Sequence, residues 1–216
     1  MFKDRIDAAQ QLAVALDAYR DSHPLVLAIP RGAVPMGAAL AEALHGDLEV
    51  VLVHKLCAQW SPEYAIGAID EHGWSFVRDA RADDAAWIAA EKQRQLATLR
   101  ARRARYSPGR EPVDARGRVA IVVDDGLATG ATMIAALHAV RAQAPARLIC
   151  AVPVAAPDSL ARVEAEADEV VCLQTPPGFQ AVGQFYQHFG QVEDDEVVDC
   201  LARFRANRKE ASGDTP

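Results

Sequence analysis

Residues with the types and spacing needed for ligand chemistry lie together between Val122 and Thr132. A run of apolar residues ends there in two adjacent carboxylates, Asp124 and Asp125, and a loop of small residues follows. Two carboxylates side by side at a strand end can accept hydrogen bonds from a vicinal diol, such as the 2- and 3-hydroxyls of ribose. The pair therefore predicts a sugar-binding position at this strand end.

The loop after the two carboxylates has the composition of a phosphate-binding loop. Small side chains at Ala128, Gly130 and Ala131 let the backbone come close to a phosphate, and the hydroxyls of Thr129 and Thr132 add donors. Where such a loop leads into a helix, its amides meet the anion at the positive end of the helix dipole. Diol acceptors and phosphate donors a few residues apart match a ribose 5-phosphate.

A purely structural role is the alternative for this stretch. An Asp pair can cap a helix at an ordinary strand–turn–helix junction, with Gly130 easing the turn. The loop is not a Walker A sequence, because no Gly-Lys-Ser/Thr follows, and the chain has no GxGxxG. We favour the binding interpretation because it accounts for the whole string from Val122 to Thr132 and not only for the Asp pair.

Five short runs of apolar and β-branched residues predict the strands that position this loop. They lack the polar alternation of a strand with one face in water, and this is typical of a parallel sheet buried on both faces. A weaker strand is predicted at 65–69. The five runs lie at 25–29, 48–53, 119–123, 148–152 and 170–173.

Amphipathic helices are predicted between the strands, because apolar residues recur there at helical spacing. Strands alternating with helices are typical of a doubly wound α/β fold, in which ligands bind at the carboxyl ends of the strands. The residues that mark the helices are Leu12, Leu16 and Tyr19; Met36, Leu40 and Leu44; and Met133, Leu137 and Val140.

We predict three parts along the chain. Residues 1–174 would form the ligand-binding α/β core, with a charged lid or helical insertion at about 57–112. Residues 175–206 would form a small C-terminal hood and a closing helix, and 207–216 a polar tail. Within the insertion, 79–106 is helical in pattern and rich in arginine. These arginines could form a basic rim around the site or a solvated helix face, and we favour the face.

The composition predicts a soluble, cytoplasmic protein. A net charge of −7 argues against a protein that works mainly on nucleic acid backbones, which need a basic face. The N-terminus lacks the apolar core of a signal peptide, and no apolar run approaches the roughly 20 residues that cross a membrane. The four cysteines form no CxxC pair, so we expect reduced thiols rather than a zinc site or disulfides.

At Val122 to Thr132 the chain resembles the type I phosphoribosyltransferase family. The signature of that family for phosphoribosyl pyrophosphate (PRPP) is an apolar strand, two acidic residues and a Thr-Gly-x-Thr loop. Arg31 and Gly32, after the first predicted strand, resemble the family's pyrophosphate loop. Lys55, after the second, lies where the family often has a basic residue facing the pyrophosphate. More closely, the chain resembles a bacterial subgroup with poorly defined acceptors.

This resemblance implies transfer of the 5-phosphoribosyl group from PRPP to a nitrogen acceptor, with release of pyrophosphate and with Mg²⁺ as cofactor. A nucleobase is the expected acceptor, as in nucleotide salvage. Asp124 and Asp125 would hold the ribose, with any contact to Mg²⁺ indirect. Arg31, Gly32 and Lys55 would stabilise the departing pyrophosphate. The remaining PRPP-binding residues would be Gly126, Ala128, Thr129, Gly130, Ala131 and Thr132.

The chain departs from the family pattern in its candidate proton acceptor. Ala128 stands where some purine-salvage members carry an Asp that acts as general base, although the adenine-type pattern also has Ala there. Glu63 is our candidate base, and it could equally be an ordinary carboxylate at the start of a helix. In the hood, Phe179 and Tyr186 are the candidates to stack on the acceptor, or they are core residues of a small lobe.

Two other functions stay open. One is a PRPP-responsive regulatory protein that keeps the fold without turnover, and the other is a phosphoribosyltransferase whose acceptor is an amine or water instead of a nucleobase. The chain is acidic and has no clear helix-turn-helix, so we expect no nucleic acid partner and no membrane. Members of the family are commonly dimers, which leaves a homodimer open as well.

Overall fold

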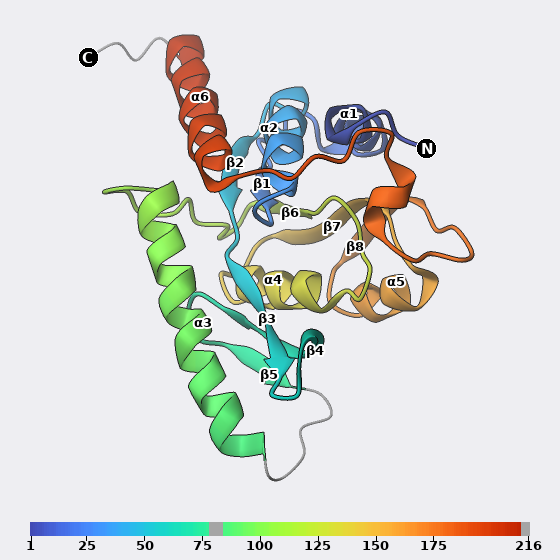
Figure 1. Ribbon diagram of the computed structural model, residues 1–216. Helices are drawn as coiled ribbons and strands as arrows, with labels where there is room; N and C mark the ends of the chain where they lie inside the picture. Colours follow the sequence, from blue (N-terminus) through green and yellow to red (C-terminus); the bar gives the residue numbers. More distant parts are fainter. Residues whose placement is uncertain (78–83, 213–216) are drawn as a thin grey trace.

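The computed structural model describes residues 1–77 and 84–212, except for the side chains of residues 62, 63, 211 and 212. Its centre is a parallel sheet of five strands in the order β2-β1-β6-β7-β8 (Figure 1). All five predicted buried runs form these strands, so the predicted α/β sheet is confirmed. The strands are β1 Leu25–Ala28, β2 Asp47–Val50, β6 Val119–Val123, β7 Arg147–Val154 and β8 Glu169–Gln174.

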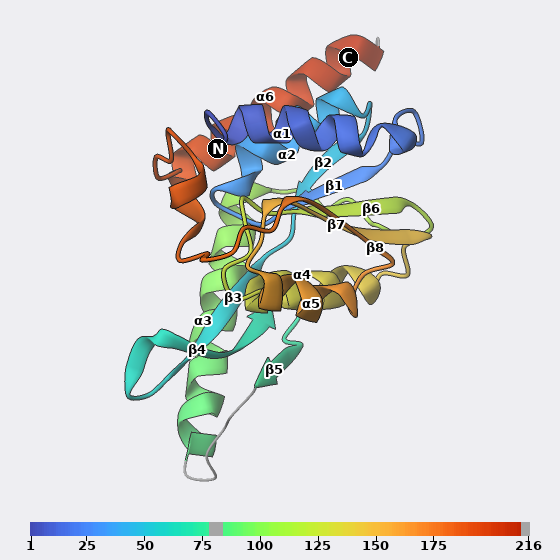
Figure 2. The same ribbon diagram turned by 90° about the vertical axis from the view of Figure 1, so that its right-hand side faces the viewer.

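Helices cover both faces of this sheet, as a doubly wound fold requires. Figures 1 and 2 show α1, α2 and α6 on one side and α4 and α5 on the other. Alternate residues of each strand serve the two layers: Val26 and Ala28 belong to the α1–α2 core, and Leu25 and Leu27 to the α4 core. The helices are α1 Arg5–Ala15, α2 Ala33–Ala43, α4 Ala131–Arg141, α5 Pro157–Glu164 and α6 Asp194–Ser212, with 3₁₀ turns at Asp17–Tyr19 and Val182–Phe185.

A second, antiparallel sheet occupies much of the predicted insertion. Strands β3 Val53–Ala58, β4 Ser61–Asp70 and β5 Ser75–Val77 pair in that order and pack on α4. The run predicted as one strand at 48–53 therefore divides, because β2 ends at Val50 and β3 begins at Val53. The predicted helix at 79–106 is α3, Ala85–Tyr106, which crosses the small sheet (Figure 1). Residues 79–83 of that prediction lie outside the described residues.

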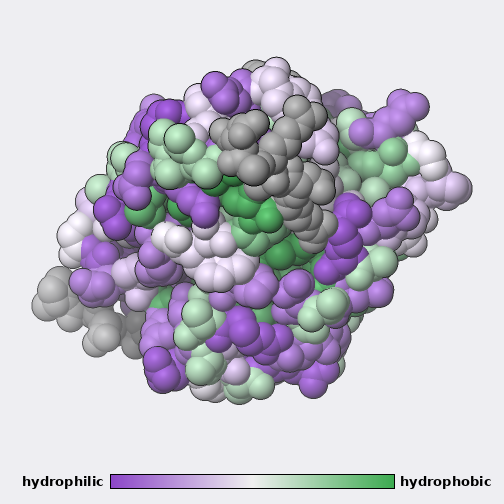
Figure 3. All heavy atoms as spheres, turned by 90° about the horizontal axis from the view of Figure 1, so that it is seen from below, coloured by the Kyte–Doolittle hydropathy of each residue, from purple (hydrophilic) through white to green (hydrophobic). Residues whose placement is uncertain are grey.

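The small sheet leaves some aromatic side chains at the surface. Trp60 and Tyr64 are 61% and 47% exposed and lie with their ring centroids 4.9 Å apart at the β3–β4 hairpin. Figure 3, which views the molecule from below, shows hydrophilic and hydrophobic residues interspersed over the visible coloured surface. Among the described helices, none combines the length and the apolar character needed to cross a membrane.

The C-terminal helix extends further than predicted. Helix α6 continues to Ser212, so the tail expected from residue 207 is helical over most of its described part. Three acidic residues in its first turn suit the positive end of the helix dipole. Near its other end, the Arg208 guanidinium binds the Asp47 carboxylate at 2.8 Å, which fixes the last turns against β2.

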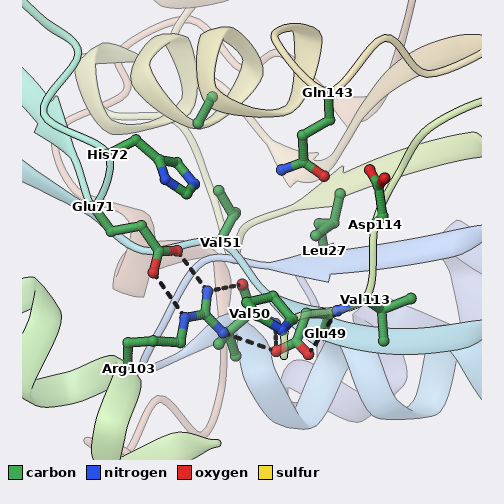
Figure 4. A pocket seen from close by; sticks show the side chains of 12 residues that line it. Leu27, Glu49, Val50, Val51, Glu71, His72, Arg103, Val113, Asp114 and Gln143 are labelled. Carbon is green, nitrogen blue, oxygen red and sulfur yellow. Dashed lines mark hydrogen bonds and ion pairs between the residues drawn. The ribbon is translucent and has the colours of Figure 1, made fainter. Parts of the chain in front are cut away.

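A buried arginine joins the small sheet to the large one. Arg103 of α3 lies between Glu49 of β2 and Glu71 of the β4–β5 turn (Figure 4). Its Nη1 lies 3.1 Å from Glu49 Oε1, its Nε donates to Glu71 Oε2 at 2.8 Å, and its Nη2 donates to the Val50 carbonyl at 2.8 Å. Glu49 is only 2% exposed. The expectation of a solvated face on α3 is therefore wrong for Arg103, because buried carboxylates draw it inward.

We expect the Arg103→Ala variant to lose about 3–5 kcal/mol of unfolding free energy, because it leaves Glu49 buried without its counter-charge. Chemical denaturation followed by circular dichroism measures the loss. Arg100→Ala, at an exposed position on the same helix, is the matched control and should change the free energy by less than about 0.5 kcal/mol. Equal effects of the two substitutions would contradict a structural role for the Glu49–Arg103–Glu71 cluster.

Candidate active site

The two loops singled out in the sequence leave the large sheet side by side. Strands β1 and β6 are neighbours with Ala28 opposite Val123, and the Ile29 amide donates to the Val123 carbonyl at 3.1 Å. The chain at Pro30–Gly32 and the Asp124–Asp125 pair therefore emerge together at the carboxyl end of the sheet. Doubly wound folds bind ligands at this end of the sheet, outside the carboxyl ends of the strands.

The Asp pair is held in a state that disfavours two negative charges. Burial and the neighbouring Asp125 carboxylate raise the pKa of Asp124 well above its ordinary value. Burial also raises the pKa of Asp125, although Arg5 opposes the rise. Lys55, exposed on β3, opposes the rise for Asp124, so its positive charge acts on the pair. The pair thus favours ligands that bring O–H donors or positive charge.

Arg5 of α1 is a member of the site that the sequence interpretation missed. Its Nε donates to Asp125 Oδ2 at 2.9 Å and its Nη1 to the Gly190 carbonyl at 2.6 Å. Its guanidinium carbon lies 3.9 Å from the centroid of the Phe189 ring. The Arg5 side chain is 13% exposed, so Asp125 has a nearly buried counter-ion. No local signal in the sequence connects Arg5 to Asp125, because 120 positions separate them.

The loop at Arg31 and Gly32 lies directly against this ion pair. A methyl group at Gly32 would lie 2.3 Å from Asp125 Oδ2 and 3.1 Å from an Arg5 nitrogen, so only glycine fits there. The preceding Pro30–Arg31 peptide is cis. The Arg31 Nη1 donates to Glu193 Oε2 at 2.8 Å, which places this guanidinium beside the start of α6. The predicted pyrophosphate and ribose positions are therefore in contact.

In the described part of the chain, the predicted phosphate loop has carbonyls that accept hydrogen bonds and amides that donate none. Ser159 Oγ of α5 donates to the Ala128 carbonyl at 2.7 Å, and Arg162 of the same helix donates to the Thr129 carbonyl at 3.1 Å. Within the described part of the chain, no hydrogen bond is donated by the amides of residues 128–132. Consecutive amides at the N-terminus of a helix form an anion site.

Backbone conformation and packing fix the shape of the same loop. Gly130 has φ +72° where α4 begins, a left-handed conformation that glycine adopts without strain. A methyl group at Gly126 would lie 2.7 Å from the Val182 side chain, so this position brings the segment after β8 close to the loop. Ala128 and Thr129 are exposed, and Ala131 and Thr132 are partly exposed. Helix α5, which was not predicted, could have been recognised from Pro157 after an apolar run.

The predicted acceptor residues lie in different surroundings. Tyr186 is 5% exposed, and its hydroxyl donates to the Asp125 carbonyl at 2.7 Å, so it supports the backbone of the Asp pair. Phe179 is partly exposed, with its ring centroid 5.2 Å from that of Phe185. Glu63 belongs to β4, but its side chain lies outside the described part of the structure. The stacking role of Phe179 and Tyr186 and the base role of Glu63 stay predictions.

The carboxylates of the site could help to bind a magnesium ion only together with a ligand that brings phosphate groups. The described residues contain no group of three or more His, Cys, Asp or Glu side chains that could hold a metal ion. Mg²⁺ commonly binds through one or two carboxylates together with substrate phosphates and water. Because Arg5 already occupies Asp125, Asp124 is the carboxylate with capacity for a cation that a ligand brings.

Comparison with known proteins places the chain in a family. Residues 2–187 match the family described as "Phosphoribosyl transferase domain". Two proteins of Mycobacterium tuberculosis (strains H37Rv and CDC 1551), each named "Putative phosphoribosyl transferase", are 43% identical over 98% of the chain. The alignment covers 48% of their length, so the chain spans about half of these relatives.

A solved structure has the same fold over nearly its whole length. The crystal structure of TT1426 from Thermus thermophilus superposes with a TM-score of 0.81 at 41% identity, covering 94% of this chain and 98% of that one. The chain belongs to the phosphoribosyl transferase domain family, and its predicted type I fold is confirmed.

We expect the Gly32→Ala variant to lose about 1–3 kcal/mol of unfolding free energy, because the added methyl group must displace Asp125 or Arg5. Thermal and chemical denaturation measure the loss. Gly190→Ala is the matched control in the same cluster, since a methyl group there meets nothing within 4 Å. If both variants keep the stability of the unmodified protein, the close contact at Gly32 does not constrain the site.

The Asp124→Asn variant should be more stable than the unmodified protein, by roughly 1 kcal/mol at pH 8. The pKa of Asp124 is raised in the folded state. The unmodified protein therefore loses stability as the pH rises from about 4 through the raised pKa, because Asp124 ionises more readily in the unfolded chain. Asn does not ionise, so the variant lacks this loss. Denaturation at a series of pH values tests this, with the exposed Asp114→Asn as control. A stability difference that does not grow with pH would contradict the raised pKa.

Proposed function

We propose that the chain transfers the 5-phosphoribosyl group of PRPP to a nitrogen acceptor and releases pyrophosphate. One observation carries the proposal: a single strand–loop–helix segment offers two carboxylates and then five consecutive amides that have no acceptor among the described residues. Carboxylates suit the ribose diol, and amides at a helix N-terminus suit the 5-phosphate. The family membership supports the same reaction class.

The ribose would be held at Asp124, with Asp125 fixed behind it. Arg5 and the Tyr186 hydroxyl bind Asp125 from two sides, so this residue serves mainly to position the neighbouring carboxylate. The diol hydroxyls would donate to Asp124 and lower the free energy cost of its negative charge. Rigid binding of the 5-phosphate and the diol leaves the C1 centre exposed to attack between them.

The leaving pyrophosphate would lie at the Pro30–Gly32 loop. Arg31 would exchange its ion pair with Glu193 for a pyrophosphate oxygen, since both are anionic partners for one guanidinium. Lys55 would add a second positive charge from β3, because it already acts on Asp124. Magnesium, when bound, would neutralise charge on the pyrophosphate, with Asp124 the carboxylate that fits it.

A nucleobase is our proposed acceptor. The partly exposed Phe179, packed beside Phe185, gives the hood a ring that could stack on a base. A cavity of 290 Å³ also lies next to the phosphate loop, between Thr129 and Tyr64 of β4. Ala128 contributes no general base, so the acceptor nitrogen would lose its proton to another group, for which Glu63 is the candidate.

Pyrophosphate release from PRPP tests the proposal. The protein is incubated with PRPP and Mg²⁺ against a panel of purines, pyrimidines and simple amines, and pyrophosphate is measured. We expect release that depends on one nitrogen acceptor. The Asp124→Asn variant should weaken PRPP binding by roughly 10- to 100-fold, because charge-assisted hydrogen bonds to the diol are lost. Asp114→Asn should leave binding unchanged.

The possible failures have different meanings. Tight PRPP binding without release for any acceptor would favour the PRPP-responsive regulatory protein. Release in water alone would favour hydrolysis. No PRPP binding by the folded protein, or binding that is insensitive to Asp124→Asn, would overturn the assignment of the site.

A further inference from the structure

A second hollow lies near the amino-terminal ends of the strands of the large sheet, whereas the candidate active site lies at their carboxyl ends. It has a volume of 510 Å³ and lies between the C-terminal half of α6, the segment around residues 108–113 and the start of β2. Asp47, which lines the hollow, is the first residue of β2, whereas the Asp124–Asp125 pair follows the last residue of β6. We call this hollow the basic groove, because four of its lining residues are Arg110, Arg205, Arg208 and Lys209.

The positive charge of the basic groove is only partly neutralised. Asp47, the one carboxylate among the described residues that line it, is shared by Arg208 at 2.8 Å and by Arg118 at 2.7 Å. Over the described residues, neither Arg110 nor Arg205 forms an ion pair, and Arg205 reaches only Ser107 Oγ at 3.4 Å. Burial and the nearby Arg110 lower the pKa of Arg205, which agrees with two like charges facing the same space.

Among the described residues, Arg110 and Arg205 differ from arginines such as Arg103, Arg105 and Arg141, each of which forms an ion pair with a carboxylate. They also share one hollow, so two guanidinium charges face the same space. Planar guanidinium groups bind phosphate oxygens through paired hydrogen bonds, and this makes arginine the usual residue for phosphate recognition. A partly buried guanidinium gains most from an anionic partner, because water screens it less.

We propose that the basic groove is a second binding site, which takes a phosphorylated small molecule between Arg110 and Arg205. A hollow of this volume matches the usual size of small-molecule sites. A nucleic acid needs a basic surface that extends along its backbone, and the acidic chain does not favour one. Arg208 also lines an adjoining apolar pocket of 340 Å³ with Phe204, which would suit a ligand with a nonpolar part beside its phosphates.

Calorimetric titration with ATP and with inorganic tripolyphosphate tests the basic groove. The full chain is compared with an Arg110→Gln/Arg205→Gln variant and with a control that carries Arg116→Gln and Arg203→Gln. Arg116 and Arg203 lie near the same two segments, and neither lines the basic groove. We expect the first variant to weaken binding of at least one probe about tenfold or more, because two charge-assisted contacts are lost. The control should bind like the unmodified protein.

Parallel PRPP titrations separate this site from the proposed active site. PRPP affinity should be the same in all three proteins, since Arg110 and Arg205 lie away from the Asp pair. Equal affinity of all three proteins for both probes, or no saturable binding of either probe, would overturn the proposal. So would a labelled single-stranded RNA that binds through the two arginines while ATP and tripolyphosphate do not. Failure of PRPP to bind would count against the proposed function and not against the basic groove.

Discussion

The largely buried ion pair between Arg5 and Asp125 is the contact on which the candidate active site depends. It joins the first helix to the end of β6, and Gly32 lies against it with no space for a side chain. The Gly190 carbonyl and the Phe189 ring hold the same guanidinium. Four separate segments are thus fixed by one charge pair, and removing either partner would leave the other buried and uncompensated.

The neighbouring Asp124 carboxylate, in contrast to Asp125, has no ion pair with a described basic residue. Arg5 neutralises Asp125, whereas Asp124 accepts one hydrogen bond from the Asp125 amide at 2.9 Å and otherwise has the more distant charges of Lys55 and Arg5. Its ionised form is therefore costly until a ligand supplies donors. Partial removal from water makes the ionised Asp124 carboxylate unfavourable in the folded protein. A ligand that donates hydrogen bonds to this carboxylate removes that unfavourable free energy, and the difference adds to the free energy of binding. Such local instability is common at sites that must favour a bound state.

The sequence predicts the large sheet well because the apolar runs of β1 and β6 are short and buried on both faces. It also singles out Asp124 and the predicted phosphate loop, since these lie within one continuous motif. It does not predict β3 and β5, which pair with β4 on either side, so their neighbours in space include residues that no local pattern identifies. Arg5 and Arg103 are missed for a similar reason: each is defined by a partner far away along the chain, and no local pattern records such a partner.

Arg5 binds the Gly190 carbonyl, which lies 185 positions further along the chain. The family match ends at residue 187, yet the Gly190 carbonyl and the Phe189 ring that hold Arg5 come later, as does Glu193 beside Arg31. A fragment cut at the family boundary would contain every recognisable motif and still lack these supports. During synthesis on the ribosome, the first helix must likewise wait until Phe189 and Gly190 have been made before its arginine finds these partners.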